Sequence, residues 1–223
     1  MLSPSITLEL KRNGRIIICE GEHDKHFLES LITRRRLPTF QVLDAHACCG
    51  IGGVSGLVPA LEGLYAIHGF TELAGIAIVT DNDNVRSLTN LQRKLDESEH
   101  YDSIQPLRIG KMAGISVIII PIPDHDNHGS LETLCLPTLH EKWPDARECT
   151  DDYLRCTGAI RWGRHKLSKA QVRCIISGFY KKEPDKGLGY LFKADKALAD
   201  HACFDGLYSI LNRFDDIIER GSF

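Results

Sequence analysis

The sequence predicts an α/β fold, with a parallel sheet of about four strands flanked by helices and a C-terminal helical region. Four short apolar runs, at 15–19, 40–44, 74–80 and 114–123, alternate with stretches of helical periodicity. Beyond residue 136 the pattern changes, and its regular segments are helical. Strands and helices that alternate with short turns are typical of parallel, doubly wound sheets covered on both faces.

The composition of the 223 residues is that of a globular chain with a sizeable core, since 43% are hydrophobic and 26% charged. The apolar runs are far shorter than the roughly 20 residues that cross a bilayer, so no membrane partner is expected. The first residues lack the basic and apolar segments of a secretion signal, which favours the cytoplasm. The eight cysteines include no Cys-x-x-Cys pair, so free thiols are expected rather than a zinc site.

The first strand is a continuous apolar run at 15–19, which indicates burial on both faces and ends at Glu20-Gly21. Residues 24–36 then carry apolar side chains at helical spacing until Pro38 ends the helix. Residues 6–11 alternate weakly and predict an additional edge strand.

The second strand, at 40–44, leads into a glycine-rich loop at 50–56 and a helix at 58–67. The loop matches neither a P-loop nor a dinucleotide-binding fingerprint. Because glycine lets a backbone approach a ligand closely, we still expect this loop beside the functional site. The third strand, at 74–80, is followed by a polar helix at 85–95.

The fourth strand, at 114–123, is rich in β-branched residues and is expected to be central. An acidic loop at 124–132 follows and enters a short helix at 131–136, with Ser130 as a candidate N-cap.

Residues 1–136 are therefore predicted to form the α/β domain, and residues 137–223 a helical region packed on it. Amphipathic helices are expected at 168–179, with Ser168 as N-cap, and at 205–219. Residues 143–144 and 149–157 have an irregular pattern.

Acidic residues follow three of the predicted strands. Asp81 and Asp83 stand two residues apart at the end of the third strand, where an extended chain directs both carboxylates to one side. Glu20 follows the first strand and Glu132 the fourth. Ligands of parallel sheets bind at the rim formed by the carboxyl ends of the strands. Since Mg²⁺ binds carboxylates, water and phosphate oxygens, the pattern predicts a Mg²⁺ or Mn²⁺ site.

The charge distribution is uneven along the chain. Residues 155–196 contain eleven Lys or Arg and three acids, which gives this segment a charge of +8. Since the net charge of the chain is −3, the other residues together carry −11. Such a basic segment beside an acidic body is typical of a polyanion-binding face, and a solvated helical surface is the alternative. Arg161, Arg164 and Lys166 are the candidate nucleic-acid-binding residues.

Three short motifs occur in a recognisable order: Glu20-Gly21-x-x-Asp24, then the glycine-rich turn, then Asp81-x-Asp83. This order resembles the Toprim domain shared by topoisomerases, bacterial primases, RecR-type repair proteins, small ribonucleases and OLD-family (overcoming lysogenization defect) nucleases. The later Gly129-Ser-Leu-Glu132 is similar to the third acidic motif of the OLD-like branch and its small stand-alone relatives. The resemblance covers about residues 15–136 and implies a Toprim, Rossmann-like sheet.

The resemblance also implies roles for individual residues. Glu20 takes the position of a general acid/base or metal ligand, and Asp24, Asp81, Asp83 and Glu132 take positions of metal ligands. OLD-like nucleases also use a later lysine, for which Lys166 and Lys169 are both candidates; we assign Lys169 the catalytic role. The implied activity is Mg²⁺-dependent cleavage of a phosphodiester, for which two metal ions need about four converging carboxylates.

Two other interpretations remain open. The run that ends in Asp81-Asn-Asp83 also resembles the nucleophile motif of haloacid-dehalogenase-like phosphatases, with Asp81 attacking phosphorus. A non-catalytic Toprim module in a larger nucleic-acid-processing or defence complex is the alternative outside enzymes. Candidate partners are nucleic acid, DNA rather than RNA, a separate ATPase subunit and a second copy of the chain.

Overall fold

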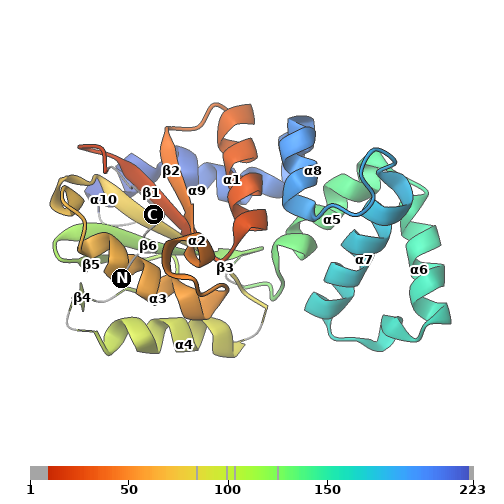
Figure 1. The fold of residues 1–223 in the computed structure, drawn as a ribbon, viewed down its shortest axis with the longest axis horizontal. Coiled ribbons are helices and arrows are strands. Elements are labelled where there is room, and N and C mark those ends of the chain that lie inside the picture. The colour runs from red at the N-terminus through yellow and green to blue at the C-terminus, as the bar shows by residue number, and fades with distance from the viewer. Residues whose placement is uncertain (1–9, 84, 99, 103, 125, 221–223) are drawn as a thin grey trace.

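The computed structural model describes residues 10–83, 85–98, 100–102, 104–124 and 126–220, and a six-stranded sheet lies at its centre (Figure 1). The strands lie in the order β2-β1-β3-β6-β5-β4. Their bounds are β1 Arg15–Cys19, β2 Phe40–Asp44, β3 Gly75–Asp81, β4 Tyr101–Asp102, β5 Ile109–Met112 and β6 Ile115–Ile122. The strands β2, β1, β3 and β6 run parallel, which confirms the predicted α/β class.

Two strands of the sheet, β4 and β5, were not predicted from the sequence. Strand β5 pairs antiparallel with β6, and β4 pairs antiparallel with β5. The turn between β5 and β6 consists of Ala113 and Gly114, both at positive φ (47° and 88°), as in a two-residue hairpin. The hairpin was missed because alanine is not a residue typical of such a turn. Of the edge strand predicted at 6–11, residues 6–9 lie outside the described residues, and Leu10 and Lys11 are not in a strand.

Apolar side chains of the parallel strands alternate between two cores, one on each face of the sheet. On β1, Ile16 and Ile18 enter one core, and Ile17 and Cys19 enter the other. Helices α2 (Ala45–Cys49), α3 (Val54–Tyr65) and α4 (Val85–Asp96) cover the first core. Helix α1 (Glu22–Arg34) and helices from the C-terminal part of the chain cover the second. The sheet is therefore the middle of three layers.

The C-terminal part of the chain is helical. Helices α5 to α7 lie together at one end of the molecule, and α8 lies beside α1 (Figure 1). The bounds are α5 Leu131–Lys142, α6 Ala146–Cys156, α7 Arg164–Phe179, α8 Leu188–Ala194, α9 Asp205–Asn212 and α10 Phe214–Arg220. The described residues also form four short 3-10 helices. One lies before β3, η1 Phe70–Glu72, and three lie in the C-terminal part, η2 Ala159–Arg161, η3 Lys196–Asp200 and η4 Ala202–Phe204.

Several helices differ from the sequence prediction. The segment 149–157, predicted to be irregular, belongs to α6, which buries only Ala146, Thr150 and Leu154 and so has a weak apolar pattern. Helix α5 continues through Pro137 to Lys142. Helix α7 begins four residues before Ser168, which is therefore not its N-cap. The helix predicted at 205–219 is divided between α9 and α10.

The last helices are tied to the first strand and the first helix. Arg15 at the start of β1 donates hydrogen bonds to the Asp215 carboxylate on α10, with 2.6 Å from Nε to Oδ1. Arg34 Nε of α1 donates to Asp200 Oδ2 at 2.7 Å. No helix in the described ranges is both long and apolar enough to cross a membrane.

Candidate functional site

The predicted acidic residues lie where the order of the strands reverses. From β1 the chain passes to β2 on one side and later to β3 on the other side, so β1 and β3 are neighbours at a switch point. The loops that follow such strands diverge, and open α/β sheets bind ligands in the crevice between them. Glu20 directly follows β1, and Asp81 is the last residue of β3.

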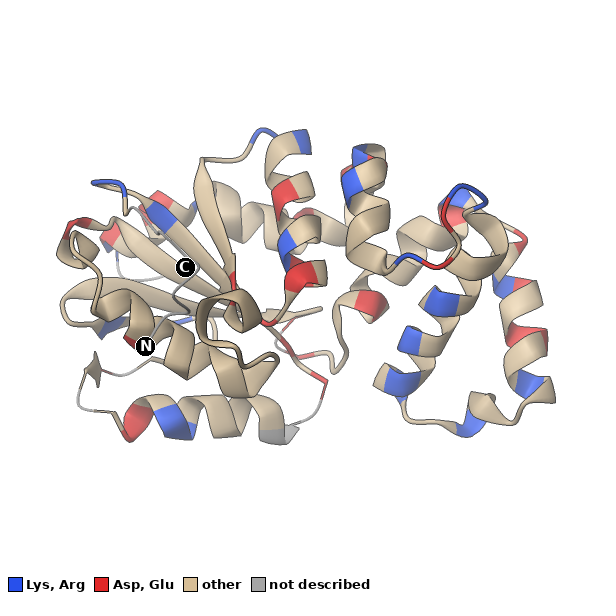
Figure 2. Ribbon diagram, in the orientation of Figure 1, with Lys and Arg blue, Asp and Glu red and all other residues tan. Residues whose placement is uncertain are grey.

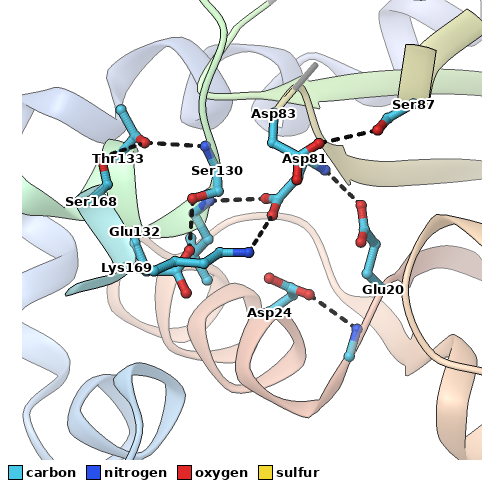
Figure 3. A network of polar contacts seen from close by, with 12 residues as sticks. Glu20, Asp24, Asp81, Asp83, Ser87, Ser130, Glu132, Thr133, Ser168 and Lys169 are labelled. Atoms are coloured by element: carbon cyan, nitrogen blue, oxygen red, sulfur yellow. Dashed lines mark hydrogen bonds and ion pairs between the residues drawn. The ribbon is translucent and has the colours of Figure 1, made fainter. Parts of the chain in front are cut away.

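Glu20 is held by the end of the neighbouring strand. Its Oε1 accepts a hydrogen bond from Thr80 Oγ1 at 2.6 Å. The same oxygen accepts one from the Asp81 amide at 2.9 Å (Figure 3). Burial raises the pKa of Glu20, the two hydrogen bonds oppose this rise, and the Asp83 carboxylate adds to it. The position of Glu20 is therefore fixed by β3 as well as by its own strand.

The glycine-rich loop at 50–56 runs beside Glu20. The Gly53 amide donates a hydrogen bond to the Glu20 carbonyl at 3.2 Å, and Gly53 has a φ of +69°. A β-carbon at Gly56 would lie 1.9 Å from the carbonyl oxygen of Ile51. Glycine is required at both positions for the loop to pass this close to the rim of the sheet.

Asp24 brings a second carboxylate from the same strand–helix unit. It lies in the first turn of α1, where its Oδ2 accepts a hydrogen bond from the Gly21 amide at 3.0 Å. Burial, followed by the nearby charge of Glu20, raises the pKa of Asp24 from 3.8 to about 7. Asp24 thus caps the helix and also belongs to the acidic cluster.

Asp81 contacts groups from two distant parts of the chain. Its Oδ1 accepts a hydrogen bond from the Leu131 amide at 2.9 Å, and its Oδ2 lies 3.9 Å from Lys169 Nζ (Figure 3). The side chain is only 15% exposed. Burial raises the pKa of Asp81 well above its ordinary value, the carboxylates of Glu20 and Asp24 raise it further, and Lys169 opposes them.

Glu132 is positioned by a chain of side-chain hydrogen bonds. Its Oε2 accepts a hydrogen bond at 2.7 Å from Ser130 Oγ, and Ser130 is fully buried. The Ser130 amide donates to Thr133 Oγ1 at 3.2 Å, and Thr133 Oγ1 donates to Ser168 Oγ on α7 at 3.0 Å. Because Lys169 follows Ser168, this chain of bonds holds the lysine's helix against the acidic rim.

Asn82, between the two aspartates, is a structural residue that the sequence did not single out. It is 1% exposed, and its Nδ2 donates hydrogen bonds to the carbonyls of Asp124 at 3.0 Å and Asn127 at 3.3 Å. Its carbonyl accepts from the Gly129 amide at 2.9 Å. Asn82 therefore fixes the loop that leads to Glu132; an amide between two acids gives no sequence signal for this role.

Asp83 is oriented differently from Asp81. Strand β3 ends at Asp81, so the two-residue alternation does not continue to Asp83. Its Oδ1 accepts a hydrogen bond from Ser87 Oγ of α4 at 3.1 Å (Figure 3). The structure thus brings Glu20, Asp24, Asp81 and Glu132 together with Lys169, and places Asp83 beside them with its carboxylate toward α4.

The cluster carries more negative than positive charge. In the side-chain conformations of the described residues, no group of three or more His, Cys, Asp or Glu could hold a metal ion. The donor chemistry nevertheless fits a hard divalent cation, because the groups are carboxylate oxygens. Burial, followed by their mutual repulsion, raises the pKa values of Asp24 and Asp81. A divalent cation would remove this repulsion once the side chains turn toward it.

The predicted basic residues lie outside the acidic cluster. Arg161 in η2, and Arg164 and Lys166 in the first turn of α7, are exposed. Figure 2 shows Lys and Arg residues along α7 and acidic residues at the strand ends. Lys169 is the α7 cation that contacts the cluster, at Asp81.

The comparisons with known proteins give one match. No curated protein and no solved structure matches the chain. A family model described as a protein of unknown function, DUF3226, matches residues 14–216. The match covers most of the 223 residues, so the chain belongs to the DUF3226 family.

Proposed function

We propose that this protein is a Mg²⁺-dependent nuclease of the Toprim, OLD-like type that hydrolyses phosphodiester bonds in nucleic acid. One observation carries the proposal: Glu20, Asp24, Asp81 and Glu132, from three strand ends, lie together at the switch point beside Lys169. Converging carboxylates with a nearby cation are suited to phosphoryl chemistry, which depends mainly on positioning and charge stabilisation.

The carboxylates of Asp81, Glu20 and Glu132 would hold the metal, with Asp24 and Asp83 as further ligands. Bound Mg²⁺ or Mn²⁺ would supply charge stabilisation and acidify a water molecule. Glu20 is also the candidate general base, as the Toprim resemblance implies, and burial raises its pKa above the ordinary value. The Lys169 ammonium, 3.9 Å from Asp81, is placed to attract the phosphate charge of a substrate.

The proposed partners follow from the same site and from the charge along the chain. Nucleic acid, DNA rather than RNA, is the proposed substrate, and exposed Arg161, Arg164 and Lys166 would contact its phosphates. An ATPase subunit and a second copy of the chain are further proposed partners, and the cytoplasm is the proposed compartment.

The test is cleavage of labelled single-stranded, double-stranded and supercoiled DNA, and of RNA, with Mg²⁺ or Mn²⁺. The wild type is compared with Asp81→Asn and with Asp96→Asn, which changes an exposed aspartate on α4 as a matched control. Cleavage that requires the metal, persists in Asp96→Asn and disappears in Asp81→Asn would support the proposal. Cleavage retained by Asp81→Asn would contradict the site assignment.

The alternatives give different results in the same experiment. A haloacid-dehalogenase-like phosphatase would leave polynucleotides intact, hydrolyse small phosphate monoesters and yield a trapped phosphoaspartate at Asp81. A non-catalytic module would bind nucleic acid or a partner without hydrolysing either class, and Asp81→Asn would bind as the wild type does.

A further inference from the structure

Helices α6 and α7 form a groove that the proposed catalytic chemistry does not use. A cavity of about 450 Å³ lies between them, lined by residues that include Tyr153, Trp162, Lys166, Lys169 and Arg173. A second cavity of about 440 Å³ shares Tyr153 and Arg173 with it, and a third, also of about 440 Å³, shares Trp162 and Lys166. Since they share lining residues, the three cavities adjoin one another along α7, and we call the surface that they line the α6–α7 groove.

The two aromatic residues of the groove are unusually exposed. Trp162 is 54% exposed and Tyr153 is 57% exposed, the highest values among the large apolar side chains of the described residues. Exposed aromatic side chains that line a depression are typical of binding surfaces. Neither residue is explained by the packing of the core, because neither belongs to the two hydrophobic clusters of the described residues.

The charge of the groove has one sign. Lys166, Lys169 and Arg173 stand three and four residues apart on α7 and so lie on one face of the helix. No Asp or Glu lines any of the three cavities, all of which involve described residues only. A row of cations beside two exposed rings is complementary to a chain of phosphates that carries stackable bases.

The groove is connected to the acidic cluster through one residue. Lys169 lines the groove and its Nζ also lies 3.9 Å from Asp81 Oδ2. Ser168, the preceding residue, is bonded to Thr133 beside Glu132, so the groove and the acids are held by the same helix. A polynucleotide chain lying in the groove would thus have a phosphate near Lys169, at the edge of the proposed catalytic site.

We infer that the α6–α7 groove binds single-stranded nucleic acid, with bases stacked on Tyr153 and Trp162 and phosphates paired with Lys166 and Arg173. This inference rests on the proposed function, since it names the form of substrate presented to that site. Unpaired bases expose both ring faces, whereas paired bases in a duplex are already stacked on their neighbours, so the aromatic residues select the single strand.

The test measures binding in the presence of EDTA, where metal-dependent cleavage is absent. Fluorescence anisotropy is recorded with a labelled single strand and with a duplex of the same sequence. We expect tighter binding to the single strand, and for Trp162→Ala or Tyr153→Ala about tenfold weaker binding per lost stacked base. Trp162→Phe and Tyr153→Phe retain a ring and should stay close to the wild type.

Tryptophan fluorescence assigns the contact to one residue. The chain has two tryptophans, Trp143 and Trp162. Stacking on Trp162 should quench the emission of the wild type when the single strand is added, and this quenching should vanish in Trp162→Phe although binding persists. Lys166→Gln and Arg173→Gln should each reduce the slope of log K against log salt by about 0.7, with exposed Lys182→Gln as the control.

Equal binding of duplex and single strand would overturn the inference, and so would unchanged affinity in both alanine variants. A third contrary result is a wild-type dimer that light scattering shows to become a monomer in Trp162→Ala, because the groove would then be an interface between two copies of the chain. If the protein cleaves with metal but shows no quenching, the groove inference fails and the proposed function stands. If the single strand binds and quenches but no polymer is cleaved, the proposed function fails and the groove assignment is supported.

Discussion

The acidic cluster at the strand ends and the α6–α7 groove hold their charges in opposite ways. In the cluster, Glu20 and Asp81 are half-buried and accept hydrogen bonds from backbone amides. In the groove, Lys166 and Arg173 are exposed on a helix surface. Carboxylates held by hydrogen bonds have fixed positions, as chemistry requires, whereas exposed long cations can follow a variable polymer. The first region is suited to reaction and the second to recognition.

The largest expected effect is that of Asp81→Asn in the acidic cluster, which should lower cleavage activity without lowering stability. Asp81→Asn should reduce metal-dependent cleavage by more than about a hundredfold, because even residues outside the first coordination shell of a metal contribute 10–100-fold. The same change removes one of several repelling carboxylates, so the free energy of unfolding without metal should stay equal or rise. Chemical denaturation measures this, and a large loss of stability would contradict the electrostatic account.

A loss of both activity and stability is expected for Asn82→Ala. Asn82 is buried, and its removal leaves the carbonyls of Asp124 and Asn127 without these bonds, which should cost about 1–3 kcal/mol. Cleavage should fall as Glu132 loses its position, while single-strand binding in the groove stays unchanged. Equal losses of binding and cleavage would mean that the two regions are not independent.

The pH dependence of stability should distinguish the cluster from the groove. Asp24 has an ordinary pKa of 3.8 and a pKa of about 7 in the folded chain, so the folded state holds its proton more tightly. Its contribution to stability is therefore greatest at low pH and is lost as pH rises from about 4 to about 7. Urea denaturation of metal-free protein should show this decline, and Asp24→Asn should flatten it.

Mg²⁺ provides the complementary measurement. Because it binds ionised carboxylates, its stabilising effect should be larger at pH above 7 than at pH near 5, and smaller in Asp24→Asn. The groove variant Lys166→Gln should show the wild-type response. An equal effect of Mg²⁺ at both pH values would argue against a carboxylate site.

The smallest expected effect concerns the link between the two regions. Ser168→Ala removes the bond from Thr133 and should lower stability by about 1 kcal/mol. Cleavage should decrease modestly through displacement of Lys169, and the exposed Ser177→Ala on the same helix is the control. A drop in cleavage without any change in single-strand affinity would locate the effect at the lysine.

The sequence predicted the strands better than the helical region, for a physical reason. Strands buried on both faces are continuous apolar runs, so β1 has its predicted bounds, and β3 and β6 differ from theirs by one residue at each end. Strand β2 also has its predicted bounds, although it contains Gln41 and Asp44. The rule for strand ends then identified the turns that hold Glu20 and Asp81. Helix α6 was missed because its buried stripe contains few apolar residues.

The partners of the site residues depend on tertiary contacts and could not be predicted in the same way. The bond from Leu131 to Asp81 joins segments 50 residues apart in sequence. The turn of Asp83 toward Ser87 follows from the exact end of β3, which no pattern defines. The exposure of Tyr153 on α6 and of Trp162 just before α7 likewise depends on tertiary packing, which no local pattern defines.

The contact of α10 with the sheet has a consequence for the time at which the protein folds during synthesis. The Phe214 ring of α10 packs against Gly75, where an added β-carbon would lie 3.2 Å from the ring. Asp215, the next residue of α10, pairs with Arg15. One face of the sheet therefore lacks part of its cover until translation has passed α10. A ribosome-bound chain that ends before this helix would expose apolar surface at the start of β1 and β3, the kind of surface on which incompletely folded chains aggregate.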